Sequence, residues 1–427
     1  MSSLPNLKGT QAEILSLGPA LPATPRTAVT YNEPGLGTQR RRATILQIVK
    51  RYVGNYDLHN EMVRTDPARF RTVVCYLAGK PDGRNKIEAI ADKTLYLDSP
   101  RLHLKWVAPP VNFQVRRIIE REQADLVVCQ ARSTVPFGVF GSLLSRLKPP
   151  VIVVMHGLPG GRTRFKDKLW RWPVYQLVSR FVSVSQSGIH DVRTLTWGLN
   201  PARIVAIQNG LALERFTTDL EREEARRMAL PELGSSFLFG TVGRLVEKKN
   251  HKTLLQAFQR VARDIPCSAL VIVGGGPLES TLKALARSLG LEGRVHFLGV
   301  RGDVPVILRA LDVFVFPTIR EGLPLSLLEA MASGLPIIAS DIGCIREVIN
   351  DGLAGGLVNP SDPHGLAEAM IRYARANSRD RAEWGARARR RILEAFSCGR
   401  MAADYERLYE QLLDPNGVKR RGANDPS

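Results

Sequence analysis

The chain is 427 residues long, with 44% apolar, 7% aromatic and 24% charged residues. This composition is that of an ordinary globular protein of about two domains, and it excludes collagen-like, disulfide-scaffold and wholly disordered chains. The 60 lysines and arginines outnumber the 41 acidic residues and give a net charge of +19, which favours an anionic partner.

The first half of the chain alternates short apolar runs with longer helical segments. Residues 1–43 are rich in Pro, Gly, Ser, Thr and Arg and predict a flexible N-terminal tail. The apolar runs that follow predict strands at 44–49, 71–77, 95–97, 125–129, 151–155 and 181–185. Most of these runs are continuous rather than alternating, so we expect strands buried on both faces in a parallel sheet covered by helices.

The second half repeats this pattern. Strands are predicted at 237–242, 269–273, 295–298, 313–316, 336–340 and 356–358, with helices such as 252–264 and 278–289 among them. The fold class is therefore α/β, with two doubly wound parallel-sheet (Rossmann-like) domains facing a cleft, where ligands bind at the carboxyl ends of the strands. The predicted limits are 44–208 for the first domain, 209–400 for the second, 401–414 for a C-terminal helix and 415–427 for a flexible tail.

The positive charge is concentrated in the first half. Residues 1–210 hold 30 lysines and arginines against 14 acids, whereas residues 211–427 hold 30 against 27. This asymmetry favours a polyanion bound by the first domain, although solubility alone could also explain it. Cations and an aromatic residue alternate in one segment that we expect to face the acceptor or a membrane, namely Arg162, Arg164, Lys166, Lys168 and Trp170.

Two further features concern location. The five cysteines are odd in number and scattered, which predicts reduced thiols and a cytosolic setting. No apolar run approaches the ~20 residues of a membrane-spanning helix, and the first 30 residues lack the apolar core of a signal peptide. We therefore expect a protein that neither crosses a membrane nor is exported through a signal peptide.

The richest motif follows the strand predicted at 313–316. Residues 321–326 (Glu-Gly-Leu-Pro-Leu-Ser) lead into a helix that carries Glu329. Amides at the start of such a helix point at an anion, and Gly322 lets a ligand approach the backbone without a Cβ in the way. Glutamates eight positions apart are common on surface helices, but Glu329 lies among apolar residues, where an acid that binds nothing is costly.

A second motif follows the strand predicted at 237–242, which ends in glycine and then Arg244, with Lys249 five positions on. Two such cations can bracket a diphosphate, each charge-assisted contact contributing roughly 1.5–3 kcal/mol. A solvated loop before a helix capped by Asn250 is an equally good interpretation. The run Gly274-Gly275-Gly276-Pro277 lacks the spacing of a phosphate loop and favours a tight strand-to-helix turn.

His156 closes the strand predicted at 151–155, which favours a polar contact with a ligand hydroxyl over a general base. No Cys or Asp stands at ligand spacing from it, and no Asp-x-Asp occurs in the chain, so we expect no metal site. The charge of a leaving group would then be met by protein cations and helix dipoles.

In this order and spacing, the motifs resemble those of the nucleotide-sugar glycosyltransferases of family 4, of the bacterial cell-surface polysaccharide or lipopolysaccharide type. The resemblance is strong over residues 237–359 and weaker over the first domain, and it rests on Gly243-Arg244-Leu245, Lys249, Val295-His-Phe-Leu298-Gly299, Asp312-Val-Phe-Val-Phe-Pro317, Glu321-Gly322-Leu323-Pro324, Leu328-Glu329-Ala330-Met331-Ala332, His156-Gly157, Val182-Ser-Val-Ser185 and Asn209-Gly210. It implies the B-type two-domain architecture, a last helix that returns to the first domain, and a retaining, metal-independent reaction with no cofactor besides the donor.

The resemblance also implies roles for the motif residues. The residues implied to bind the donor are Arg244, Lys249, Leu325 and Ser326 for the diphosphate, Glu321, Gly322, Leu323 and Pro324 for the sugar, and Glu329, Leu298, Gly299 and Val300 for the nucleoside. Glu321 and His156 would lie at the reacting carbon, with no assigned catalytic base. The loop after the first strand departs from the family pattern, because it offers Gly54 where members usually carry two glycines.

We therefore expect a glycosyltransferase that moves a sugar from a nucleotide sugar to an anionic, membrane-associated acceptor such as a glycolipid or lipopolysaccharide. It would be cytoplasmic and peripheral on the inner face of the cytoplasmic membrane, in contact with anionic lipid. The alternatives are a synthase acting on a soluble sugar, and a non-catalytic protein of the same fold that binds nucleotide sugar or a polyanion. Nucleic acid is not an expected partner, because no zinc-finger spacing or RNA-binding aromatic motif occurs.

Overall fold

The computed structural model describes residues 12–14, 41–51, 64–81, 83, 85–99, 108–157, 165–216, 220–350 and 352–414. By their contacts the residues form two compact units, the first comprising Met1–Val154, Leu169–Phe181 and Glu406–Ser427, and the second Met155–Lys168 and Val182–Tyr405. The described residues form two sheets, one of eight strands and one of six. The predicted α/β class with two parallel sheets is confirmed.

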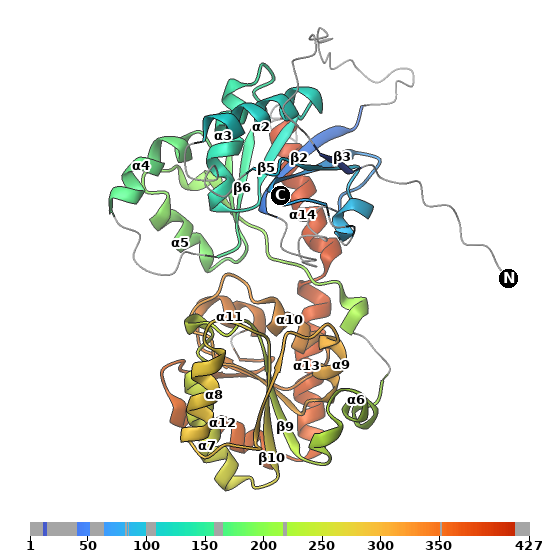
Figure 1. Ribbon diagram of the computed structural model, residues 1–427, viewed down its shortest axis with the longest axis vertical. Coiled ribbons are helices and arrows are strands. Elements are labelled where there is room, and N and C mark those ends of the chain that lie inside the picture. Colours follow the sequence, from blue (N-terminus) through green and yellow to red (C-terminus); the bar gives the residue numbers. More distant parts are fainter. Residues whose placement is uncertain are drawn as a thin grey trace, which may run out of the picture. The chain divides into compact units, whose positions relative to one another are not determined.

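The first sheet has the strand order β1-β4-β3-β2-β5-β6-β7-β8 (Figure 1). Its strands are β1 (Ala12–Ile14), β2 (Ala43–Arg51), β3 (Phe70–Ala78), β4 (Lys93–Tyr96), β5 (Leu126–Cys129), β6 (Val151–Met155), β7 (Arg180–Ser183) and β8 (Ile204–Ala206). The helices between them are α2 (Pro109–Arg121), α3 (Val135–Leu144), α4 (Phe165–Gln176) and α5 (Gly188–Leu195). The continuous apolar runs of β5 and β6 are fully buried, as helices on both faces of a parallel sheet require.

The second sheet has the order β11-β10-β9-β12-β13-β14. Its strands are β9 (Phe237–Val242), β10 (Ser268–Val273), β11 (Val295–Gly299), β12 (Val313–Phe316), β13 (Ile337–Ser340) and β14 (Gly356–Val358). The helices are α6 (Arg222–Ala229), α7 (His251–Asp264), α8 (Glu279–Ser288), α9 (Val304–Ala310), α10 (Leu325–Ala332), α11 (Gly343–Ile349), α12 (Pro363–Arg375), α13 (Ser378–Ala395) and α14 (Cys398–Leu413). Figure 1 shows α7, α8 and α12 on one side of this sheet and α9 and α13 on the other.

The order of the second sheet places a topological switch point between β9 and β12. The chain proceeds from β9 through β10 to β11 on one side, and from β12 through β13 to β14 on the other, while β9 and β12 pair directly. The loops after these two strands leave the carboxyl edge toward opposite sides, which is where doubly wound sheets bind ligands. The motifs at 243–249 and 317–326 follow these two strands.

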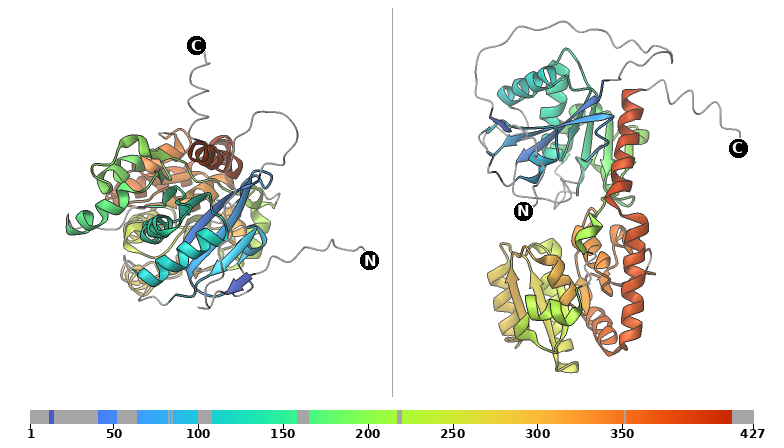
Figure 2. Two further views of the ribbon diagram at one scale, coloured as in Figure 1. Left: turned by 90° about the horizontal axis from the view of Figure 1, so that it is seen from above. Right: turned by 90° about the vertical axis from the view of Figure 1, so that its right-hand side faces the viewer.

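The two units differ in their limits from the domains predicted from the sequence. Helix α14 enters the first unit at Glu406, where Tyr409 accepts a hydrogen bond from Gln47 at 3.4 Å, and Figure 2 shows this red helix beside the first sheet. The units divide the chain between residues 181 and 182, whereas the predicted limit at 208 and 209 lies between β8 and β9. Three residues of the predicted N-terminal tail form β1, while residues 415–427 and most of 1–40 lie outside the described residues.

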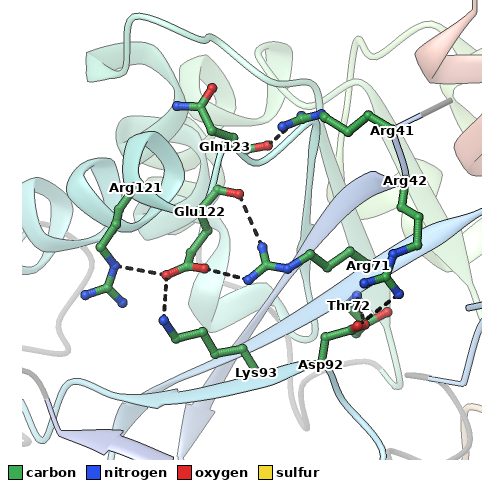
Figure 3. A network of polar contacts seen from close by, with 9 residues as sticks. All are labelled: Arg41, Arg42, Arg71, Thr72, Asp92, Lys93, Arg121, Glu122 and Gln123. Atoms are coloured by element: carbon green, nitrogen blue, oxygen red, sulfur yellow. Dashed lines mark hydrogen bonds and ion pairs between the residues drawn. The ribbon is translucent and has the colours of Figure 1, made fainter. Parts of the chain in front are cut away.

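A polar network fixes the end of α2 to the first sheet (Figure 3). The Glu122 side chain is only 5% exposed, and its carboxylate lies 2.8 Å from Arg71 Nη2, 3.2 Å from Lys93 Nζ and 2.9 Å from Arg121 Nε. Burial tends to raise the pKa of Glu122, but the hydrogen bond from Arg71 and the charges of Lys93 and Arg121 outweigh it and hold the pKa below its usual range. Glu122 therefore joins β3, β4 and α2 as a buried anion.

We predict that Glu122→Gln lowers the free energy of unfolding by about 2–4 kcal/mol at pH 7, because three cations then surround a neutral amide. The native pKa of Glu122 is lowered, so its stabilisation is present at neutral pH and is lost as the pH falls through that pKa. The difference between the variant and the parent chain should therefore shrink in acid. Urea unfolding followed by circular dichroism measures both effects, with Glu279→Gln, in an exposed pair with Lys283, as the control. Equal losses in the two variants would contradict the role of Glu122.

Candidate active site

The candidate site is built from two loops at the carboxyl ends of β9 and β12. After β9, Leu245 is fully buried and anchors the first loop, which then forms a short helical turn, η7 (Glu247–Lys249). Asn250 follows with a left-handed backbone, φ +57°, a conformation that asparagine tolerates, and starts α7. Both loops belong to the second unit.

Hydrogen bonds tie the two loops to each other. The Lys248 carbonyl accepts from the Ile319 N–H at 2.8 Å and from the Thr318 hydroxyl at 2.7 Å. The Asn250 side-chain amide donates to the Pro317 carbonyl at 3.1 Å and to the Pro360 carbonyl at 2.8 Å. These contacts fix the positions from which the ionisable side chains of both loops project.

At the centre, Glu321 is held between two consecutive lysines. Its Oε1 lies 2.8 Å from Lys249 Nζ, its Oε2 lies 3.1 Å from Lys248 Nζ, and the Thr318 hydroxyl lies 3.2 Å from Oε1. The Lys249 ammonium also lies 4.5 Å from the centre of the Phe316 ring, a cation–π contact. The Glu321 and Lys249 side chains are 9% and 14% exposed, against 48% for Lys248.

Burial and neighbouring charges have opposite effects on the pKa values of Glu321 and Lys249. Burial tends to raise the pKa of Glu321, but Lys249 first and Lys248 second outweigh it and hold the pKa below its usual range. Burial lowers the pKa of Lys249, and the attraction of Glu321 offsets this only in part. Glu321 is therefore a carboxylate at neutral pH, and Lys249 gives up its proton more readily than an exposed lysine.

A close backbone approach explains why residue 322 is glycine. A Cβ on Gly322 would lie 2.4 Å from the His156 carbonyl oxygen and 3.2 Å from the Gly157 Cα, and the second unit contains all three residues. Burial lowers the pKa of His156 to about 4, so its imidazole is neutral at pH 7. His156 can therefore act as a neutral hydrogen-bonding group beside the 321–324 loop.

The glycine run after β10 has a packing role, in agreement with the predicted turn. A Cβ on Gly274 would lie 2.0 Å from the Gly243 carbonyl oxygen, and one on Gly276 would lie 2.5 Å from the Leu245 carbonyl oxygen. The run thus lets the loop after β10 lie directly against the loop after β9. Helix α8 begins at Glu279, two residues later than a helix opened by Pro277 would begin.

The other predicted donor residues differ in their exposure. Arg244 is exposed and has no ion-pair partner among the described residues. Leu325 and Ser326 are half-buried and open α10, which no side chain caps, while Leu323 and Pro324 are buried and Glu329 is half-buried one turn into the helix. Leu298 and Gly299 end β11, and Val300, just after it, is 84% exposed.

Some predicted residues lie outside this description. Arg162, Arg164 and Gly54 are outside the described residues, and Lys166, Lys168 and Trp170 are in α4. The sequence reasoning missed Lys248, Thr318 and Phe316 as parts of the site. Their signals were present, since Lys248 precedes Lys249 and the other two flank the strand end at Pro317, but no spacing rule joins residues some 70 positions apart.

The chain matches two protein-family models that together span most of its length. Residues 55–215 match "Glycosyltransferase Family 4" and residues 223–391 match "Glycosyl transferases group 1". The Escherichia coli UDP-Gal:alpha-D-GlcNAc-diphosphoundecaprenol alpha-1,3-galactosyltransferase is 30% identical over 266 residues, which cover 60% of this chain and 68% of that enzyme. The chain belongs to family 4 of the nucleotide-sugar glycosyltransferases. The predicted family and enzyme class are thus confirmed.

Two further similarities concern the sequence and the fold of this glycosyltransferase. The N-acetyl-alpha-D-glucosaminyl L-malate synthase of Bacillus anthracis is 34% identical over 171 residues, and the match covers 40% of this chain but less than half, 44%, of that enzyme. The crystal structure of Anabaena HepE in complex with UDP-glucose has a TM-score of 0.73 at 19% identity and covers 86% of this chain and 99% of its own. The glycosyltransferase has the B-type fold.

Clusters of metal ligands and membrane-spanning helices are both absent from the described residues of the glycosyltransferase. Within the described ranges, no three His, Cys, Asp or Glu side chains gather closely enough to hold a metal ion. No helix in the part of the chain that the structure describes is both long and apolar enough to span a membrane.

A buried histidine beside the site gives a pH prediction. His251 opens α7, is 3% exposed, and its Nδ1 has no hydrogen-bond partner among the described residues. Burial, with Lys249 nearby, lowers its pKa to about 4. An unfolded histidine takes up a proton near pH 6.5, so between about pH 6.5 and 4 the unfolded chain binds more protons and stability falls as the pH falls.

We therefore predict that His251→Gln flattens the pH dependence of stability in this range, by at most about 1.4 kcal/mol per pH unit. Urea unfolding at pH 6.5, 5.5 and 4.5 measures the slope. His190→Gln, at an exposed position, is the control and should leave the slope unchanged. A slope in His251→Gln as steep as that of the parent chain would show that His251 is not the group responsible.

Proposed function

We propose that this glycosyltransferase transfers a sugar from a nucleotide diphosphate sugar, with retention and without a metal ion, to a membrane-associated glycolipid or lipopolysaccharide-type acceptor. One observation carries the donor half of this proposal. A buried, ionised Glu321 lies between Lys248 and Lys249 at the switch point of the second sheet, next to the uncapped start of α10.

The cations and amides around Glu321 suit a diphosphate. An ammonium group has three donors, so Lys249 can donate to a phosphate oxygen of the donor. Arg244, exposed and without an ion pair among the described residues, would supply a second cation. The first amides of α10, at Leu325 and Ser326, would bind phosphate oxygens at the positive end of the helix dipole.

The sheet order suits a donor that extends from this point. Strand β11 lies two positions from β9, or roughly 10 Å across the sheet, and ends in Leu298 and Gly299 before the exposed Val300. A base in contact with these residues would be joined through its ribose, bound by Glu329, to a diphosphate at the switch point. The sugar would then meet Glu321 and the backbone of residues 322–324.

A same-face reaction, which the resemblance to family 4 implies, needs no protein base. The acceptor hydroxyl oxygen would bond to the anomeric carbon on the face from which the diphosphate leaves. The departing phosphate oxygen would take the hydroxyl proton as its bond to the carbon breaks, and Lys249 and Arg244 would stabilise the released charge. Glu321 would bind sugar hydroxyls, and His156, neutral at pH 7, would hydrogen-bond the sugar.

The acceptor is inferred from charge and from one relative. The E. coli relative is named for a diphosphoundecaprenol-linked acceptor, which is an anionic lipid. In the first unit, α2 exposes Phe113, Arg117 and Arg121 four residues apart, on one side of the helix. Together with the basic segment at 162–170, this stripe suits an anionic membrane surface.

A synthase acting on a soluble sugar is the second candidate. The N-acetyl-alpha-D-glucosaminyl L-malate synthase of B. anthracis is named for L-malate, a small soluble molecule, and its match covers 40% of this chain. Because donor binding involves the second unit in both cases, only acceptor assays distinguish the two. Transfer to a free hexose or a small hydroxy acid without lipid would favour this candidate.

We predict that one member of a panel of UDP-, GDP- and ADP-sugars raises the melting temperature of the enzyme, since a ligand at 100 times its Kd adds about 2.7 kcal/mol of stability. With that donor, Glu321→Gln and Lys249→Ala should lower hydrolysis or transfer by about 10²-fold or more, because each removes a charge at the reacting centre. Lys252→Ala, an exposed lysine of α7, is the charge-matched control. Equal activity in all three variants would contradict the assigned roles.

We also predict that the enzyme co-sediments with vesicles containing phosphatidylglycerol, less with pure phosphatidylcholine vesicles, and less as salt rises, because screening weakens charge attraction. Replacing Arg162, Arg164 and Lys166 together by Gln should reduce this binding without changing donor hydrolysis. The control replaces three exposed arginines of the second unit, Arg375, Arg379 and Arg390, by Gln. Binding that ignores both lipid charge and salt would refute the membrane contact.

A further inference from the structure

The two ion pairs of Glu321 come from consecutive residues. One carboxylate is shared by two lysines that are neighbours in the chain, Lys249 on Oε1 and Lys248 on Oε2. Successive residues of a helical turn normally point in different directions. Here both reach the same acid because Glu321, from the loop after β12, lies across the η7 turn.

The two lysines differ in what else they can bind. Lys249 is largely buried and lies against the ring of Phe316. Its Cε atom lies 3.3 Å from the position that a Cβ on Gly243 would take. Lys248 is about half exposed. Its carbonyl accepts from the Thr318 hydroxyl and the Ile319 amide, and its ammonium contacts Glu321. Lys248 is thus attached to the 318–321 loop at both its backbone and its side chain.

We propose that Lys248 is a positioning residue, which holds the Glu321 carboxylate in place for the donor sugar when Lys249 turns toward the donor diphosphate. The inference rests on the proposed function, because it assigns the sugar to Glu321 and the diphosphate to Lys249. If Lys248 is replaced and a diphosphate draws Lys249 away, the largely buried Glu321 carboxylate is left without a cation. Lys248 prevents this and acts through Glu321, without touching the donor.

This role predicts that losing Lys248 weakens binding of the donor sugar but not binding of the diphosphate. In Lys248→Gln, affinity for the nucleotide sugar and kcat/KM should fall roughly five- to tenfold, while the nucleoside diphosphate without its sugar binds within about twofold of the parent chain. Lys248→Arg should recover kcat/KM to within about twofold, because it restores the charge. The probes are the nucleotide sugar that binds in the panel of UDP-, GDP- and ADP-sugars and the nucleoside diphosphate with the same base.

The pH profile gives an independent readout. The titratable or charged groups that face Glu321 are Lys248 and Lys249 from η7 and the Cys344 thiol from α11, whose pKa burial raises to about 12 and which is therefore neutral. Removing Lys248 should raise the pKa of Glu321, so the acid limb of kcat/KM should move to higher pH in Lys248→Gln and return in Lys248→Arg.

The closing experiment measures donor and diphosphate affinities by calorimetry, and kcat/KM from pH 4 to 8, in the parent chain, Lys248→Gln, Lys248→Arg and Lys252→Gln. Circular dichroism melts establish that each variant is folded. Selective loss of the sugar contribution, with recovery in Lys248→Arg, supports the inference. It is overturned if Lys248→Gln behaves like Lys252→Gln, or if donor and free diphosphate lose affinity equally. If no nucleotide sugar binds the parent chain, the proposed function fails, and the inference fails with it.

Discussion

The burial of one carboxylate at the switch point of the second sheet is the constraint on which the site depends. Glu321 is 9% exposed, and an ionised group at that depth is strongly destabilising unless cations and hydrogen bonds surround it. The chain meets this need with two lysines, Lys248 and Lys249. Because both lysines come from the loop after β9 and Glu321 comes from the loop after β12, the electrostatic requirement also sets the geometry of both loops.

At several positions near Glu321 the residue type is set by the room available for a side chain and not by charge. The loop after β9 can lie close to the loop after β10 only because Gly274 and Gly276 have no Cβ. Gly322 is required for the same reason, since backbone atoms of His156 and Gly157 occupy the space that a side chain would need. The glycines thus allow close packing that charged side chains alone could not produce.

The sequence predicts the fold well because continuous apolar runs are a strong local signal. The strands predicted at 151–155 and 313–316 coincide with β6 and β12, whereas β1 and β8, of three residues each, were not predicted. The equally short edge strand β14 was predicted at 356–358, so length alone does not explain why β1 and β8 were missed. The motifs after β9 and β12 could be located by the same logic, because strand ends in parallel sheets mark the ligand edge.

What the sequence could not predict is which side chains share a partner. Lys248 and Lys249 look alike in the sequence, and only their unequal burial distinguishes them. Nor does spacing reveal that Thr318 bonds the backbone of a residue 70 positions earlier. Such contacts depend on how two loops from different strands fold over the sheet edge, which is a tertiary property with no local signal.

The lowered pKa of Lys249 has a thermodynamic consequence for an anionic ligand. Because burial lowers this pKa in the native state, the unfolded chain binds the proton of Lys249 more tightly, so keeping this lysine charged reduces stability at neutral pH. A diphosphate beside Lys249 would raise the pKa again and relieve that cost. Part of the free energy of binding would then come from removing a destabilisation that the folded protein already contains, and the second lysine on Glu321 would leave Lys249 free to make that contact.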